Sequence, residues 1–130
     1  MKEFFEKFID IEKDISKKKG DFELFAVFLR EDAADKWDIV ASADWLKKDN
    51  LKDLKYLANV IKKKLGGDNK RLSRVVVIDR DNPALKALHS AIKTEHKGAE
   101  FFNSNFFGLL IKHGFIITSK KRNGVKKVIK

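Results

Sequence analysis

The sequence predicts a single-domain α/β protein in which one mixed β-sheet is flanked by helices. Three observations favour this class: apolar residues at helical spacing near the N-terminus, an almost uninterrupted apolar run typical of a buried strand, and an alternation of strand and helix patterns. At 130 residues the chain is close to the commonest domain size, and its eleven Phe supply an aromatic-rich core. We therefore expect one domain over residues 1–130.

The first part of the chain predicts an N-terminal helix and a leading β-hairpin. Apolar residues recur every three or four positions from Phe4 to Ile15, which indicates an amphipathic helix, and Gly20 is its expected end. Residues 22–29 are apolar at almost every position, as expected of a strand covered on both faces. After a polar turn, residues 37–43 form the expected second strand, which pairs antiparallel with the first.

Two further helices are expected around a third strand. Asn50 is the predicted cap of a helix over residues 51–65 that ends at a Gly-Gly pair. A β-branched run within residues 72–79 predicts the strand. Asn82 then caps a helix with Pro in its first turn, and this helix is expected to end near Gly98.

The C-terminal third of the sequence returns to strand patterns. Residues 99–102, 106–111 and 115–118 are expected to be extended. An Asn-Gly pair further on favours a type I′ turn, because both residues accept the positive φ angles that this turn needs. We therefore expect residues 120–130 to form a basic C-terminal hairpin or tail.

Positive charge is concentrated in two segments of a chain whose formal net charge is +10. The segment Lys112 to Lys130 contains no acid, and the segment Lys62 to Arg74 contains only Asp68. Clustered cations attract polyanions, since each neutralised phosphate releases condensed counterions. We expect a non-catalytic binding or interaction module that contacts nucleic acid or another acidic partner. The expected polyanion-binding residues are Lys120, Lys121, Arg122, Lys126 and Lys127, with Lys63, Arg71 and Arg74 as a second patch.

A metal-dependent phosphodiesterase or nuclease-like enzyme is the alternative function. Asp79 and Asp81 directly follow the third predicted strand, and Asp38 on the hairpin supplies another carboxylate. Oxygen ligands of this kind hold Mg²⁺. Capping of the next helix explains the Asp79–Asn82 cluster more simply. The acid-x-Lys pair that nucleases of the restriction-endonuclease type place on an adjacent strand is also missing from the third strand.

Histidines and a polar triplet provide weaker candidate sites. His89 and His96 are expected on one helix, seven residues apart, with Glu95 adjacent to His96. This spacing does not bring two imidazoles to one metal ion, so we interpret them as histidines at the edge of the core. Residues 103–105, Asn-Ser-Asn, lie between two Phe pairs and would suit a stacked planar ligand, but a turn explains the same pattern.

Several other classes find no support in the sequence. The chain has no Cys, which excludes disulfides and thiolate chemistry, and it lacks a glycine-rich phosphate loop and a nucleophile-elbow motif. We expect no cofactor. Without a signal-peptide pattern or a membrane-spanning apolar stretch, a cytoplasmic protein with no membrane partner is expected. A homo-oligomeric or complex-forming structural protein is a third alternative, with Phe101 and Phe106 as candidate interface residues.

Overall fold

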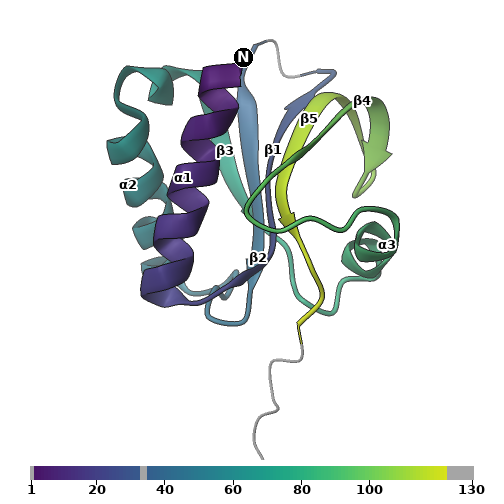
Figure 1. The fold of residues 1–130 in the computed structure, drawn as a ribbon, viewed down its shortest axis with the longest axis horizontal. Coiled ribbons are helices and arrows are strands. Elements are labelled where there is room, and N and C mark those ends of the chain that lie inside the picture. Colours follow the sequence, from purple (N-terminus) through teal and green to yellow (C-terminus); the bar gives the residue numbers. More distant parts are fainter. Residues whose placement is uncertain (1, 33–34, 123–130) are drawn as a thin grey trace, which may run out of the picture.

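A five-stranded mixed β-sheet forms the centre of the fold and carries helices on both faces (Figure 1). The computed structural model describes residues 2–32 and 35–122. The elements in chain order are α1 (Lys2–Lys19), β1 (Phe22–Arg30), β2 (Trp37–Ala43), α2 (Leu51–Leu65), the 3₁₀ helix η1 (Gly66–Arg71), β3 (Leu72–Val77), α3 (Pro83–Ala91), β4 (Ala99–Phe106) and β5 (Leu109–Ser119). The predicted α/β class is confirmed, as are the N-terminal helix, the leading hairpin and the two further helices.

The strands lie in the order β3-β2-β1-β5-β4, so that β1 is central and β3 and β4 are the edge strands. β1 pairs antiparallel with both β2 and β5, β4 pairs antiparallel with β5, and β2 pairs parallel with β3. Every residue of β1 from Phe22 to Leu29 is buried. This burial confirms the inference from the uninterrupted apolar run, because a central strand is covered on both faces.

Helices α1 and α2 cover one face of the sheet (Figure 1). The α1 residues Phe4, Phe8, Ile11 and Ile15 recur at helical spacing, and all four are buried in a cluster that includes Phe25 of β1. Burying each side chain of this size stabilises the fold by about 1.5–3 kcal/mol relative to leaving it in water. The amphipathic pattern therefore fixes which side of α1 faces the sheet.

Helix α3 lies on the opposite face of the sheet, on the same side as the curled β4–β5 hairpin (Figure 1). Leu85 and Leu88 of α3 are buried with Leu24 and Phe28 of β1 and with Ile116 of β5. This second core is smaller than the first, since one short helix replaces two long ones.

Asparagine caps determine where α2 and α3 begin. The Asn50 side chain accepts hydrogen bonds from the backbone N–H groups of Lys52 and Asp53, and the Asn82 side chain accepts one from Ala84. Both caps satisfy N–H groups that have no partner within the helix. The two predicted starts are confirmed, and so is the end of α2 before the Gly-Gly pair.

Helix α3 ends at Ala91, well before the expected end near Gly98. Thr94 forms an isolated antiparallel bridge with Ser119, so the chain leaves the helix to lie beside the end of β5. His96 therefore belongs to the α3–β4 connection. The prediction that His89 and His96 share one helix is wrong.

The C-terminal strands have different boundaries from those expected. Residues 99–106 form one continuous strand, so the Asn-Ser-Asn triplet lies within β4 and not in a turn. The hairpin turn falls at Phe107 and Gly108, whose φ angles are 54° and 75°. Two consecutive positive φ angles are what a tight antiparallel hairpin needs, and they divide the expected strand 106–111.

The hairpin predicted at Asn123-Gly124 lies outside the described residues, as do Lys126 and Lys127. Within the described ranges, no helix is both long and apolar enough to cross a bilayer.

Candidate functional site

A groove of about 600 Å³ lies between α2 and the edge strand β3. Apolar side chains from both elements line it: Leu54, Ala58 and Ile61 of α2, and Leu72 and Val75 of β3. The three α2 residues follow the spacing i, i+4, i+7 and so share one helix face. Leu54 and Ala58 are half-buried, because they form the outer edge of the apolar stripe of α2, where the helix no longer meets the sheet.

Basic side chains surround this apolar floor. The lining includes five cationic residues and no carboxylate, and these residues are Lys36, Lys55, Lys62, Lys70 and Arg74. Lys55 and Lys62 lie two helical turns apart on α2. Lys36, in the β1–β2 connection, donates a hydrogen bond from Nζ to the backbone oxygen of Lys70 over 3.0 Å. We call the apolar floor and these five cations the basic groove.

Most of the positive charge in the basic groove lacks a carboxylate partner. No Asp or Glu oxygen of the described residues lies within ion-pair distance of the ammonium groups of Lys36, Lys55, Lys62 and Lys70. Arg74 differs, since its Nε lies 3.2 Å from Oδ2 of Asp38. Four ammonium groups without an ion-pair partner in the described part of the chain therefore surround one apolar floor.

The three carboxylates of the predicted metal site are not brought together. Asp38 is buried on β2 and pairs with Arg74 on β3, five residues before Asp79. At about 3.3 Å per strand residue, this register separates the backbones of Asp38 and Asp79 by roughly 16 Å. Asp79 forms an ion pair with Lys48 over 3.3 Å, and Asp81 is exposed.

Two of the C-terminal cations singled out in the sequence share one carboxylate partner. Nη2 of Arg122 lies 2.6 Å from Oε2 of Glu95, and Nζ of Lys120 lies 3.0 Å from its Oε1. The hydrogen bond from Arg122, followed by that from Lys120, lowers the pKa of Glu95 to about 2. Lys121 is exposed beside them. These contacts reduce the net charge that the end of β5 presents to a polyanion.

Of the second predicted patch, only Arg74 lines the basic groove. Lys63 is exposed on α2 but does not line the groove, and the guanidinium of Arg71 lies 4.1 Å from the ring centroid of Phe4 on α1. Lys55 was not among the predicted residues, although its seven-residue spacing from Lys62 places both on one helix face. No local pattern points to Lys36, because its position depends on the packing of the β1–β2 connection against η1.

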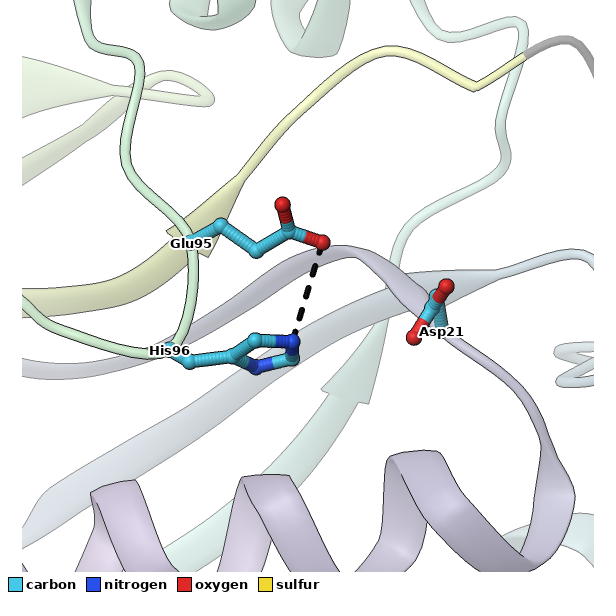
Figure 2. A group of neighbouring side chains, drawn as sticks. All are labelled: Asp21, Glu95 and His96. Atoms are coloured by element: carbon cyan, nitrogen blue, oxygen red, sulfur yellow. Dashed lines mark ion pairs between the residues drawn. The ribbon is translucent and has the colours of Figure 1, made fainter.

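A second group of polar residues lies where β1 begins and β5 ends (Figure 2). Glu95 and His96 come from the α3–β4 connection, and Asp21 immediately precedes β1. Each offers one potential metal-binding atom, and these atoms lie within 4.8 Å of one another. Nε2 of His96 is 3.7 Å from Oε2 of Glu95.

Glu12 of α1 is fully buried, and its carboxylate is hydrogen-bonded to Nδ1 of His96. Its Oε1 lies 2.6 Å from Nδ1 of His96, while its Oε2 accepts hydrogen bonds from Thr118 over 2.8 Å and from Ser16 over 3.2 Å. The backbone N–H of His96 donates to Oγ1 of Thr118. Glu12 was not among the predicted residues, although a carboxylate next to Ile11 within an apolar stripe is a visible signal.

This network is stabilised by its own cations. A carboxylate on one imidazole nitrogen, with further carboxylates beside the other, is a donor set that suits a divalent metal. Arg122 and Lys120 already bind Glu95, however, and Nη1 of Arg122 lies 3.8 Å from Asp21. We therefore interpret the Glu12–His96 network as a structural connection between α1, the α3–β4 connection and β5.

Exposed apolar side chains lie on the β4–β5 hairpin. Phe102 is 58% exposed and Leu110 is 62% exposed, and the Phe102 ring stacks on the imidazole of His113. Phe101 and Phe106, the residues that the sequence suggested for an interface, instead pack around Phe28 in the second core.

Comparisons with known proteins add no functional assignment. No protein-family model matches the chain, and neither a curated protein sequence nor a solved structure matches it. The basic groove is therefore the strongest basis for a function.

Proposed function

We propose that this protein is a non-catalytic binding module that docks an acidic partner in the basic groove between α2 and β3. The observation that supports this proposal is the lining of the groove, which has five cationic side chains and no carboxylate. A hollow lined by one sign of charge and walled by apolar atoms concentrates the electric field and raises the local concentration of anions. The uncompensated ammonium groups of Lys55 and Lys62 are central to this attraction.

The expected affinity is moderate and depends on salt. An exposed ion pair contributes roughly 0.2–1 kcal/mol, so four such pairs give about 1–4 kcal/mol, which corresponds to millimolar binding at best. The apolar floor supplies the remainder, since each partner side chain buried there adds about 1.5–3 kcal/mol before the entropic cost of docking. We therefore expect dissociation constants in the micromolar to millimolar range that rise with ionic strength.

A matched pair of charge-reversal variants tests this proposal. Lys55→Glu/Lys62→Glu alters the groove, and the control Lys13→Glu/Lys17→Glu makes the same charge change on exposed positions of α1. Lys62 and Lys17 both lie in the last turn of their helices, so the helix-dipole effects are similar. The probes are a fluorescent polyglutamate peptide and a fluorescent single-stranded oligonucleotide, and binding is measured by anisotropy.

Wild-type protein is expected to bind at least one acidic probe at low salt and to bind it more weakly at high salt. The groove variant should lose about tenfold or more in affinity, whereas the α1 control should stay within about twofold of wild type. Absence of binding to both probes at low salt, or equal losses in the two variants, would contradict the proposal.

A further inference from the structure

We infer that the partner of the basic groove is an extended acidic peptide that adds a sixth strand to the sheet along β3. This inference rests on the proposed function and names the class of partner. β3 lies at the edge of the sheet and pairs with β2 alone among the described strands.

The free edge of β3 presents unpaired backbone groups. The N–H of Ile78 donates to the backbone oxygen of Ala41 on β2 over 2.8 Å, so this residue points its backbone groups toward β2. Hydrogen-bonding direction alternates along a strand, and the N–H and C=O groups of Val77 and Val75 therefore point away from β2, toward the free edge. Such an edge is a template for another strand.

The sequence of β3 does little to prevent pairing at this edge. Natural proteins protect edge strands with Lys, Pro or bulges. β3 contains neither Lys nor Pro, its register shift against β2 lies at its start, before Arg74, and it ends in three consecutive Val. α2 forms a wall beside it, and Val75 lines the groove between them. An extended peptide held between a helix and an edge strand is a recurring mode of peptide recognition.

The groove also specifies the side chains of the added strand. Successive side chains of a strand point to opposite faces, so one alternate set packs on the floor formed by Leu54, Ala58 and Ile61. Lys55 and Lys62 also project from α2, so the acidic side chains that meet their ammonium groups belong to this same α2-facing set, and the other set points to the opposite face of the sheet. The six residues of β3 extend over about 20 Å, which matches a peptide segment of about six residues whose α2-facing side chains include both apolar and acidic ones.

An acidic peptide fits this groove better than nucleic acid or a second copy of the chain does. No aromatic side chain lines the groove to stack with nucleic-acid bases, and its floor is apolar. A second copy of the chain pairing through its own β3 would bring an identical set of cations to the interface, which is unfavourable. An acidic extended peptide can pair with the cations, pack on the apolar floor and hydrogen-bond to the free backbone groups of β3 at the same time.

Amide hydrogen exchange on the full-length ¹⁵N-labelled chain tests the inference. The probe is a capped peptide of about eight residues with the repeat Glu-Glu-Val-Val, which places both residue types on each face of an extended strand, with a Lys-Lys-Val-Val peptide and a single-stranded oligonucleotide as comparisons. Bound Glu–Val peptide should slow exchange at Val75 and Val77 by about tenfold or more, because their N–H groups gain partners. The oligonucleotide should leave these two amides unchanged.

Two further measurements separate strand addition from simple charge attraction. Methylating alternate backbone nitrogens of the Glu–Val peptide gives two forms, and the form that blocks the nitrogens facing β3 should lose about tenfold in affinity while the other form retains it. In the Lys55→Glu/Lys62→Glu variant, the Lys–Val peptide should bind more tightly than the Glu–Val peptide.

The outcomes distinguish the inference from the proposed function. If acidic probes bind through Lys55 and Lys62 but exchange at Val75 and Val77 does not change, the docking function stands and strand addition is wrong. If the oligonucleotide binds more tightly than the peptide through the same lysines, the partner class is wrong. If no acidic probe binds, both are wrong.

Discussion

Nδ1 of His96 lies 2.6 Å from Oε1 of Glu12, and this contact joins the α3–β4 connection to α1. Glu12 is fully buried, so its carboxylate has no water to stabilise it. The imidazole of His96 and the hydroxyls of Thr118 and Ser16 provide that stabilisation instead. Glu12 thereby connects α1, the α3–β4 connection and β5, which are distant from one another in the sequence.

Replacing Glu12 should destabilise the fold strongly. Glu12→Ala removes the acceptor for Thr118 and Ser16 and the partner of His96, and breaking a buried polar pair in this way costs about 3 kcal/mol of unfolding free energy. Urea denaturation measures the loss. Glu6→Ala on the exposed side of the same helix is the control, with an expected change within about 0.5 kcal/mol. Similar changes in the two variants would contradict this role of Glu12.

Glu95 should make stability depend on pH in the acid range. Its pKa is lowered to about 2 by hydrogen bonds from Arg122 and Lys120. A group whose folded pKa is lowered contributes stability that is present above its ordinary pKa of 4.5 and is lost as the pH falls through the folded value. Glu95→Gln should therefore be less stable than wild type at neutral pH, and the difference should close between pH 4.5 and about pH 2.

Urea unfolding at a series of pH values measures this difference. Glu31→Gln is a suitable control, because Glu31 is exposed and its side chain has no partner among the described residues. Its offset from wild type should not vary over the same range. A Glu95→Gln offset that stays constant down to pH 2 would show that the ion pairs contribute nothing. Added salt should shrink the Glu95→Gln offset, since these pairs are partly exposed.

Gly114 of β5 should not tolerate a side chain while Phe101 covers it. A Cβ added to Gly114 would overlap Cζ of Phe101, so the ring must move away from its place beside Phe28. Overpacking of this kind costs about 1–3 kcal/mol, which thermal or urea unfolding resolves. The matched control is Gly67→Ala, because nothing lies within 4 Å of a Cβ added there.

A double-mutant cycle identifies the cause of the Gly114→Ala effect. In a Phe101→Ala background the ring is absent, so adding Ala at position 114 should cost much less than it does in wild type. An equal cost in both backgrounds would assign the effect to the strand backbone and not to the ring.

Local sequence signals were sufficient for the elements whose ends are set by neighbouring residues. α2 begins at the Asn50 cap and ends before a Gly-Gly pair, and both signals are readable within the helix itself. The uninterrupted apolar run of β1 likewise predicted its central place, because burial on both faces removes the usual alternation.

The predicted element boundaries are wrong where contacts between distant segments determine the backbone conformation. The pattern of α3 gave no sign that the chain would leave the helix after Ala91, since the cause is the pairing of Thr94 with Ser119. The turn at Phe107 and Gly108 was missed because a bulky aromatic rarely adopts positive φ, whereas the Asn residues nearby do so readily.

The candidate site was predictable only in part. The basic segment Lys62 to Arg74 contributes Lys62, Lys70 and Arg74 to the basic groove, although only Arg74 of these three was predicted as a binding residue. Lys36 joins them through tertiary packing that no local pattern encodes. The ion pairs of Lys120 and Arg122 with Glu95 depend equally on the fold, because residue 95 meets them only after β5 has paired.

The two flanks of the central strand are filled by segments from opposite parts of the chain. Leu24 of β1 pairs with Ser42 on one side and with Ser119 on the other. During translation, β2 is synthesised directly after β1, whereas β5 is synthesised only after β3, α3 and β4. One flank of this apolar strand therefore stays open until β5 has been synthesised, and the nascent chain must avoid aggregation over that interval.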